Sequence, residues 1–579
     1  MPVWYNETLD DQPVFDLTGD FRGGMNATMA PSLLPNNQYS YGENVMLTNA
    51  GGLRSRYGTS QLASASSPSF LFYFDTPTHE KLMMVRDNTF SYYDGSTTST
   101  VSGFSETGGM ALMQGMDMFF TATSGGLYEF DGTNLYKTKQ LKVTIDSGGS
   151  GYSSASVTVS GGGSPVEDAT VAATVAGGAV SVLNITNQGR GYTSTPTLTI
   201  TGDGSSATAT AELVDPPSGT IGVWHTNRMF LAGLTGEQSD TIRVSDLLDQ
   251  TNWPAANSFR VGGGEGESIM ALKSWDVMNM LVWKESSTYL VQTDPVQSVA
   301  NWPIQKVSDN IGCVSSRTAV QVGADVWWLS KQGVVSVRRM QQETQREVSA
   351  AISVPIQDYI DRINWNAANT ACATFYDNKY MLAVPLDGEA SPTHILVYDT
   401  LHQCWAGVWT GLGCKDLTPT NFSSVKGLAF SSTDGDVLEY DAAKTADTIQ
   451  GTATAYSSKI YLRGYSFGEV VTQKTALNTE VEFYRSSATD VTFSVNLDEA
   501  DPIIVASNIA SGAALTTLPF EEEAGIVLAA LGTTQKSYNI MGYPQFRSLQ
   551  PRLEANTGVL SLRTLKASAF LDTIDLHTG

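Results

Sequence analysis

The chain has 579 residues and a formal net charge of −24, from 34 basic and 58 acidic side chains. This length exceeds what one hydrophobic core usually supports, so several domains are expected, and no apolar run reaches the ~20 residues of a membrane span. The negative charge is the wrong sign for a nucleic-acid-binding surface and otherwise favours solubility. The N-terminus shows no secretory signal, which predicts maturation in the cytoplasm.

The segment from residue 20 to 58, "DFRGGMNATMAPSLLPNNQYSYGENVMLTNAGGLRSRYG", is rich in turn residues. Its glycines and Pro35 predict sharp bends. Its apolar anchors are too sparse to form a core alone: Phe21, Leu33, Leu34 and Leu53. We therefore expect this arm to pack on another surface, either a partner protein or, as an ordinary strand pair, the rest of its own chain.

The next pattern is a repeat of short strands. In "KLMMVRDNTFSYYDG", "MDMFFTATSGGLYEFDG" and "NKYMLAVPLDGEASPTHILVYDT" an apolar strand leads through a turn into a strand that ends with an aromatic residue near an Asp. Counting looser copies, six to seven units predict an irregular β-propeller of about six blades. The half-unit at residues 426–441 suggests that a late strand completes the first blade and closes the ring.

A different repeat interrupts one connection of the propeller. Residues 145–163 and 185–204 superimpose in register, and each is followed by an alternating Ala/Thr/Val strand, which predicts a small β module over residues 139–214. In both copies a Gly-Tyr pair should form a tight turn whose ring covers a thin core. These tip-turn residues are Gly151, Tyr152, Gly191 and Tyr192. A phosphate-binding loop is the weaker alternative, because no helix follows either turn.

Longer alternating strands after residue 445 predict a C-terminal β-sandwich. The expected organisation is therefore all-β. Its segments are an N-terminal arm (1–65), a first propeller part (66–138), the inserted module (139–214), a second propeller part (215–445) and the sandwich (446–579).

No catalytic or metal-binding motif is present, and the five histidines are scattered singly. We therefore expect no enzyme activity, no metal and no cofactor. The four cysteines, Cys313, Cys372, Cys404 and Cys414, are interpreted as buried thiols, and a bridge between Cys404 and Cys414 is the disfavoured alternative.

The arm resembles the N-terminal stretch of tail nozzle proteins of short-tailed bacteriophages, the family of tail tubular protein B and packaged-DNA stabilisation proteins. As architecture, the resemblance extends through the propeller units and the terminal sandwich, whereas the Gly-Tyr module has no fixed counterpart. Arm residues that match the family pattern, and that the resemblance implies as adaptor or platform contacts, are Phe21, Gly23, Gly24, Asn26, Leu33, Leu34, Pro35, Leu53, Arg54 and Arg56.

The resemblance implies a virion structural protein of the tail. Six copies would enclose a lumen below the ring of head-to-tail adaptor subunits, retain the packaged DNA and conduct it during ejection without reading its sequence. The N-terminal arm and the C-terminal sandwich would form the platform on the adaptor. Tail fibres are a further expected partner, and the tip is a candidate for contact with the host surface.

Two other functions stay open at this stage. A receptor-binding or glycan-binding tail protein would use the Gly-Tyr module and exposed aromatic residues such as Trp253 or Trp302. A propeller glycoside hydrolase would need a pair of carboxylates at catalytic separation.

Overall fold

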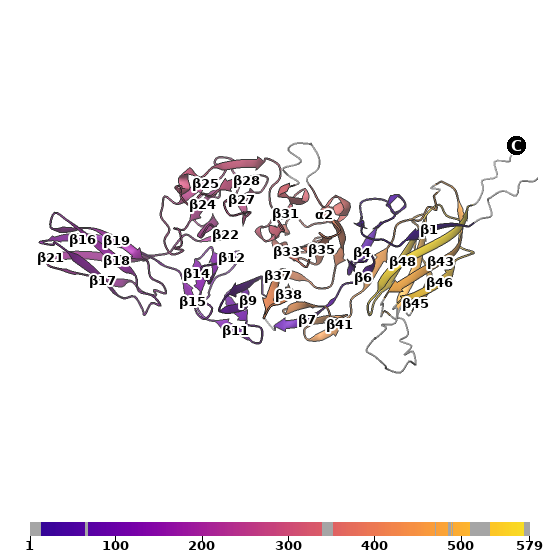
Figure 1. Ribbon diagram of the computed structural model, residues 1–579, viewed down its shortest axis with the longest axis horizontal. Coiled ribbons are helices and arrows are strands. Elements are labelled where there is room, and N and C mark those ends of the chain that lie inside the picture. The colour runs from indigo at the N-terminus through magenta and orange to yellow at the C-terminus, as the bar shows by residue number, and fades with distance from the viewer. Residues whose placement is uncertain are drawn as a thin grey trace, which may run out of the picture.

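The computed structural model describes residues 13–63, 68–338, 351–468, 471–484, 488, 490–509 and 533–571. More than half of these residues lie in β-strands and very few in helices, which confirms the all-β prediction. The molecule is elongated: the inserted module lies at one end, a ring of small sheets in the middle and a β-sandwich at the other end (Figure 1).

Seven sheets in the described part of the chain form the ring, one more than the expected count of about six. Their strands, from the inner to the outer one, are β8 (Phe70–Thr76), β9 (His79–Arg86), β10 (Thr89–Tyr93) and β11 (Thr98–Val101); β12 (Met110–Gly115), β13 (Met118–Thr123), β14 (Leu127–Phe130) and β15 (Leu135–Lys137); β22 (Gly219–His225), β23 (Arg228–Leu234), β24 (Thr241–Val244) and β25 (Ser258–Arg260); β26 (Ile269–Ser274), β27 (Asn279–Lys284), β28 (Thr288–Gln292) and β29 (Ile304–Ser308); β30 (Val320–Val322), β31 (Asp325–Ser330) and β32 (Gly333–Ser336); β33 (Cys372–Tyr376), β34 (Lys379–Val384), β35 (His394–Asp399) and β36 (Cys404–Trp409); β37 (Cys414–Phe422), β38 (Val425–Ser432), β39 (Val437–Asp441) and β7 (Gly58–Ala63).

The inner strands contact one another around the ring. Gln114, at the end of β12, receives the backbone N–H of Asp75, at the end of β8, at 3.1 Å. Between the last and first sheets, the N–H of Leu71 donates to Asp416 Oδ2 at 2.8 Å. The first and last sheets are therefore in contact, as the propeller architecture requires.

The strand exchange between the chain ends runs opposite to the predicted direction. We expected a late strand to complete the first sheet, whereas the early strand β7 pairs antiparallel with β39 and completes the last one. The first sheet is built from consecutive strands only. The spacing of the repeat units in the sequence could not distinguish a late strand in the first sheet from an early strand in the last sheet. Either exchange leaves half a unit near residue 441.

The sixth sheet continues beyond the ring into the sandwich. After β36 it gains β4 (Tyr41–Glu43), β42 (Ser458–Tyr461), β47 (Leu549–Ala555), β44 (Val491–Leu497) and β45 (Ile503–Ile509), nine strands in all. The facing sheet has the order β46 (Thr533–Asn539), β43 (Lys474–Tyr484), β48 (Ser561–Leu571), β6 (Leu53–Ser55) and β5 (Val45–Leu47), and β1 (Val14–Thr18) also pairs with β48. We call these two sheets, from β4 outward, the platform.

One apolar core runs from the fifth and sixth ring sheets into the platform. It includes Trp405 of β36, Phe21 of the arm and Phe493 and Leu565 of the C-terminal strands. Because propeller and platform share this core, the arm is part of the fold and the two bodies are joined by packing as well as by chain.

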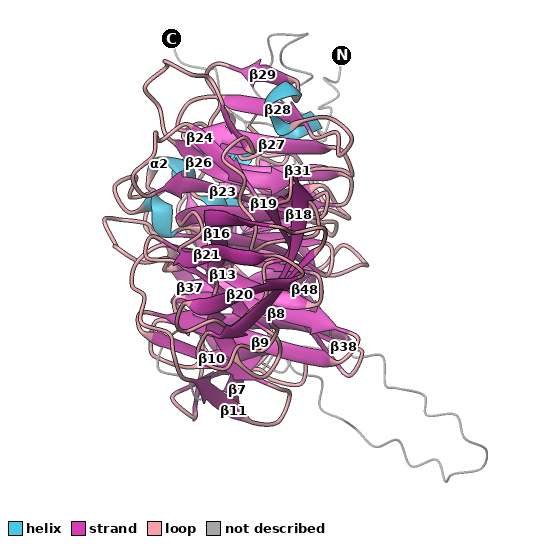
Figure 2. Ribbon diagram, turned by 90° about the vertical axis from the view of Figure 1, so that its left-hand side faces the viewer, coloured by secondary structure: helices cyan, strands magenta, loops and turns pink. Residues whose placement is uncertain are grey.

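The inserted module is made by its two sequence repeats pairing with each other. β16 (Gln140–Ser150), β17 (Ala155–Gly161) and β18 (Thr170–Ala176) of the first copy pair with β21 (Ser205–Val214), β20 (Pro196–Gly202) and β19 (Ala179–Asn187) of the second. Figure 2 looks along the long axis from this end, with the module's strands in front of the ring.

The α-helix α2 (Gln357–Asp361) lies in the connection between the fifth and sixth sheets. No described helix has the length and apolarity of a membrane-spanning segment.

Candidate functional site

The arm residues implied as adaptor contacts lie mostly inside the protein's own fold. Phe21, Leu53 and Arg56 are fully buried and Leu34 is 5% exposed. The surface on which the arm packs is thus its own chain, which corrects the expectation that these four side chains face a partner. The reason is long-range: strands from both chain ends cover anchors that are too sparse to form a core by themselves.

The remaining arm residues divide between turn formation and the surface. Gly24 has a φ of +77°, and a Cβ there would lie 2.5 Å from the Cβ of Cys404, so only glycine fits. Asn26 donates to Gln38, and Arg54 donates to the Tyr57 hydroxyl at 3.2 Å. Gly23 donates its N–H to Asn37, and Pro35 accepts from Gln38. Leu33, by contrast, is 65% exposed.

The outer surface of the platform carries apolar side chains that sequence reasoning missed. Phe15 and Leu17 are 58% and 54% exposed, and both lie on β1, which pairs only with β48 among the described strands. The Lys566 ammonium lies 4.3 Å from the centre of the Phe15 ring. A strand with one open edge and exposed apolar side chains can accept a strand of another chain.

Both Gly-Tyr turns have the predicted backbone, but only the first lies at the tip. The second lies at the base of the module, where Arg190 contacts Met118 of β13 and a Cβ on Gly191 would lie 3.4 Å from Tyr136 of β15. Gly151 and Gly191 have φ values of +78° and +79°. Tyr152 and Tyr192 are buried, and the Tyr192 hydroxyl accepts the N–H of Ala169 at 2.7 Å. The two rings therefore support the thin core of the module and are not exposed for binding.

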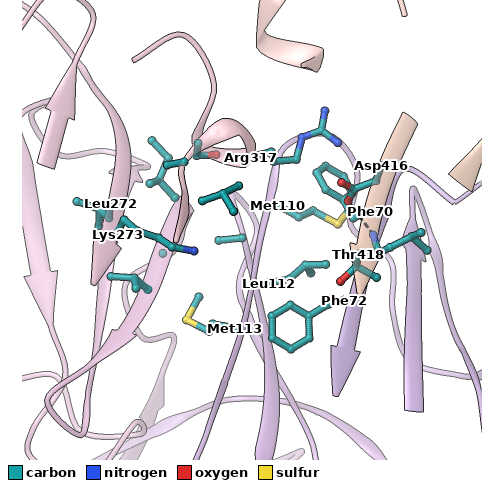
Figure 3. A pocket seen from close by; sticks show the side chains of 18 of the residues that line it. Phe70, Phe72, Met110, Leu112, Met113, Leu272, Lys273, Arg317, Asp416 and Thr418 are labelled. Carbon is teal, nitrogen blue, oxygen red and sulfur yellow. Dashed lines mark hydrogen bonds between the residues drawn. The ribbon is translucent and has the colours of Figure 1, made fainter. Parts of the chain in front are cut away.

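A cavity of about 440 Å³ lies on the axis of the ring, and inner strands from all seven sheets or the turns before them contribute to its wall. We call it the axial cavity. Its charged residues are Lys273 of β26, Arg317 and Asp416 of β37, and its apolar wall includes Phe72, Leu112 and Met113 (Figure 3).

Two of these charged groups are held by the backbone. Arg317 donates to the carbonyl oxygens of Ser69, Lys415 and Thr370 at 2.7–3.2 Å. Asp416 accepts the N–H groups of Leu71 and Leu417. Burial raises the pKa of Asp416, while Arg317 and these hydrogen bonds oppose that shift. Lys273 makes no hydrogen bond or ion pair with any described residue, and burial lowers its pKa.

A second cavity of about 700 Å³ lies farther along β8, β33 and β37, where their hairpins turn. Aromatic, amide and acidic side chains meet there. Its wall consists of Tyr73, Asp75, Phe375, Tyr376, Asp377, Asn378, Pro419, Thr420, Asn421 and Lys426.

Other sequence candidates occupy structural positions. Trp253 and Trp302 are 4% and 5% exposed, with indole N–H groups bonded to the carbonyls of Gln250 and Asp294, so neither is the exposed aromatic contact that the glycan-binding alternative would use. The four cysteines are free and buried, which confirms the thiol interpretation. No group of three or more metal-ligating side chains occurs within the described ranges.

Comparisons with known proteins leave the family open. No family model and no curated protein matches the chain. Solved structures that match include a chain of the mitotic checkpoint complex (6% identity, 67% of this chain, 94% of that chain, TM-score 0.29). Others are BBS1N in complex with ARL6DN (9%, 67%, 97%, TM-score 0.29) and an exo-beta-1,3-galactanase from Phanerochaete chrysosporium (9%, 59%, 93%, TM-score 0.21). At these TM-scores we infer neither fold nor function from them, and the propeller assignment stands on the strand topology.

Proposed function

We propose that this protein is a subunit of a homohexameric tail nozzle of a short-tailed bacteriophage, located in the virion below the adaptor ring. The observation that carries the proposal is the joining of both chain ends into one platform that continues the sixth propeller sheet. A platform of this composition is what the resemblance of the arm implies. A subunit that bears load along a tail benefits from a shared core between platform and propeller.

The dimensions of the propeller favour a conduit between copies. The axial cavity has a volume of about 440 Å³, which is the size of a small-ligand site. A DNA duplex is too wide to pass through it, because its major groove alone measures about 12 Å across. DNA would therefore pass through a lumen enclosed by several subunits. The net charge of each subunit is −24, and where acidic side chains line the lumen they would repel the phosphates, an effect that salt weakens.

Adaptor contact is assigned to the exposed apolar residues of the platform in place of the buried arm residues. Phe15 and Leu17 on β1, together with Leu33, supply apolar area, and the open edge of β1 supplies backbone donors and acceptors. The Gly-Tyr module lies at the opposite end of the molecule, where tail fibres or the host surface would be met (Figure 1).

Electron microscopy of the purified protein mixed with the adaptor protein of the same phage tests this assignment. Sixfold rings on the adaptor are expected for the native chain. The double variant F15S/L17S should fold and lose the adaptor, while the control V182S, at a module residue that is 52% exposed, should assemble normally. Monomers that never assemble with the adaptor would refute the nozzle, and normal assembly of F15S/L17S would refute only the role of β1.

The second cavity favours one alternative, a glycan-binding tail protein. Rings of Tyr73, Phe375 and Tyr376 beside Asn378 and Asn421 offer the combination of apolar faces and hydrogen-bonding groups that a sugar requires. Binding of the protein to a glycan array, abolished by Y376A, would support this function. Turnover of a polysaccharide would instead indicate a glycoside hydrolase.

A further inference from the structure

Lys273 is a half-buried lysine in the wall of the axial cavity and has no partner among the described residues. It lies on the inner strand β26 next to the buried Leu272, and Figure 3 shows its amino group reaching into the axial cavity. The side chain makes no ion pair or hydrogen bond within the described part of the chain. Burial alone lowers its pKa, with no carboxylate close enough to oppose the shift.

The other charges of the cavity do not neutralise it. Asp416 is engaged by two backbone N–H groups and lies on the side of the cavity opposite Lys273 (Figure 3). Arg317 adds a second positive charge, and its three hydrogen bonds all go to carbonyl oxygens. The Lys273 side chain is half-buried and borders the cavity, so an anion that enters can take the place of water beside its ammonium.

The walls around Lys273 are suited to an apolar body. Phe72, Leu112 and Met113 face the same space as its amino group (Figure 3). A volume of about 440 Å³ is in the range of small-molecule sites, which combine apolar walls with a few polar groups that orient the ligand.

We propose that the axial cavity binds a small organic monoanion, with its carboxylate paired to Lys273 and its apolar body against Phe72, Leu112 and Met113. A single negative charge fits because Asp416 would repel a second one. An inorganic phosphate would leave the apolar wall uncovered. The site lies within one subunit, so it does not depend on the proposed nozzle function.

Titration calorimetry of the full-length protein with octanoate and with benzoate tests the proposal. We expect one saturable site per chain for at least one of the two probes. K273M keeps the length of the side chain and removes its charge, and affinity should fall about tenfold or more, since an ionic hydrogen bond is lost. K142M, at an exposed lysine of the module, is the matched control and should bind like the native chain.

Two results would overturn the proposal. One is the absence of saturable binding of both probes up to millimolar concentration by the folded native protein. The other is equal affinity in K273M and the native chain. Because Lys273 makes no hydrogen bond or ion pair with a described residue, circular dichroism of K273M is expected to match the native spectrum. K273R provides a second variant that keeps the charge.

Discussion

Arg56 and Asp447 form a bidentate ion pair in the interior of the protein. The guanidinium Nη1 and Nη2 lie 2.8 and 2.5 Å from the two carboxylate oxygens, and both side chains are almost completely buried. Arg56 Nε also donates to Asn44 at 2.9 Å. The pair joins the arm to the segment that follows the last propeller strand.

Removal of either partner should destabilise the protein strongly. R56A or D447A leaves the other charge buried and unpaired, which costs about 3–5 kcal/mol. R54A, two residues away at a partly exposed position with few hydrogen bonds, is the control and should cost less than about 1 kcal/mol. Thermal unfolding of the single variants and of R56A/D447A measures the coupling. Additive effects of the two single changes would contradict the pairing.

Glu129 should make the protein less stable as the pH rises. Burial raises the pKa of this carboxyl from 4.5 to about 7, against an opposing hydrogen bond from Gln250. The folded state therefore holds a proton that the unfolded state releases, so stability is full below pH 4.5 and falls up to about pH 7. E129Q should flatten this part of the pH profile of Tm, while E212Q, at an exposed module residue, should not.

His225 should make the protein less stable as the pH falls. Its ring bridges Ser274 at 2.8 Å and Thr293 at 2.7 Å, and burial lowers its pKa from 6.5 to about 4. The neutral ring stabilises the fold above pH 6.5, and this contribution is lost as the pH falls towards 4. In H225Q the acid-side decline of Tm should be smaller. An unchanged decline would show that other groups cause it.

The two tyrosines of the module provide a matched comparison. The Tyr192 hydroxyl accepts the Ala169 N–H, whereas the Tyr152 hydroxyl has no bond to any described residue. Y192F should cost about 1 kcal/mol and speed hydrogen exchange at the Ala169 amide about fivefold, since an amide loses its acceptor. Y152F should leave exchange unchanged. If Y192F and Y152F changed stability and amide exchange equally, the hydrogen bond between Tyr192 and Ala169 would not contribute to the stability of its turn.

The module should be removable. Gln140 pairs with Val214, and the flanking Lys139 and Asp215 form an ion pair at 2.5 Å, so the two connections leave the propeller side by side. Replacement of residues 140–214 by an Asn-Gly turn should leave a folded protein with nearly the same Tm. Aggregation of the shortened chain, or a large fall in its Tm, would show that the module belongs to the core.

Sequence patterns within a short segment predicted the structure of that segment well. They did not predict how strands from the two chain ends pair with each other. The positive φ of Gly151 and Gly191 followed from the repeat, because two copies of a Gly-Tyr turn restrict the backbone in the same way. Phe21 and Arg56 were assigned to a partner surface because much of what buries them comes from residues hundreds of positions later, such as Asp447 beside Arg56 and Trp405 in the core of Phe21. Lys273 gave no signal, since one lysine in a strand usually marks its solvent side.

The pairing of β7 with β39 also sets the order in which the molecule can be completed during synthesis. β7 leaves the ribosome early, yet its partner Val437–Asp441 is made only after all the other ring sheets. At ~5–20 residues per second the early strand waits on the order of half a minute with unpaired backbone. Its brevity and polar sequence, GTSQLA, suit a segment that must avoid aggregation over that interval.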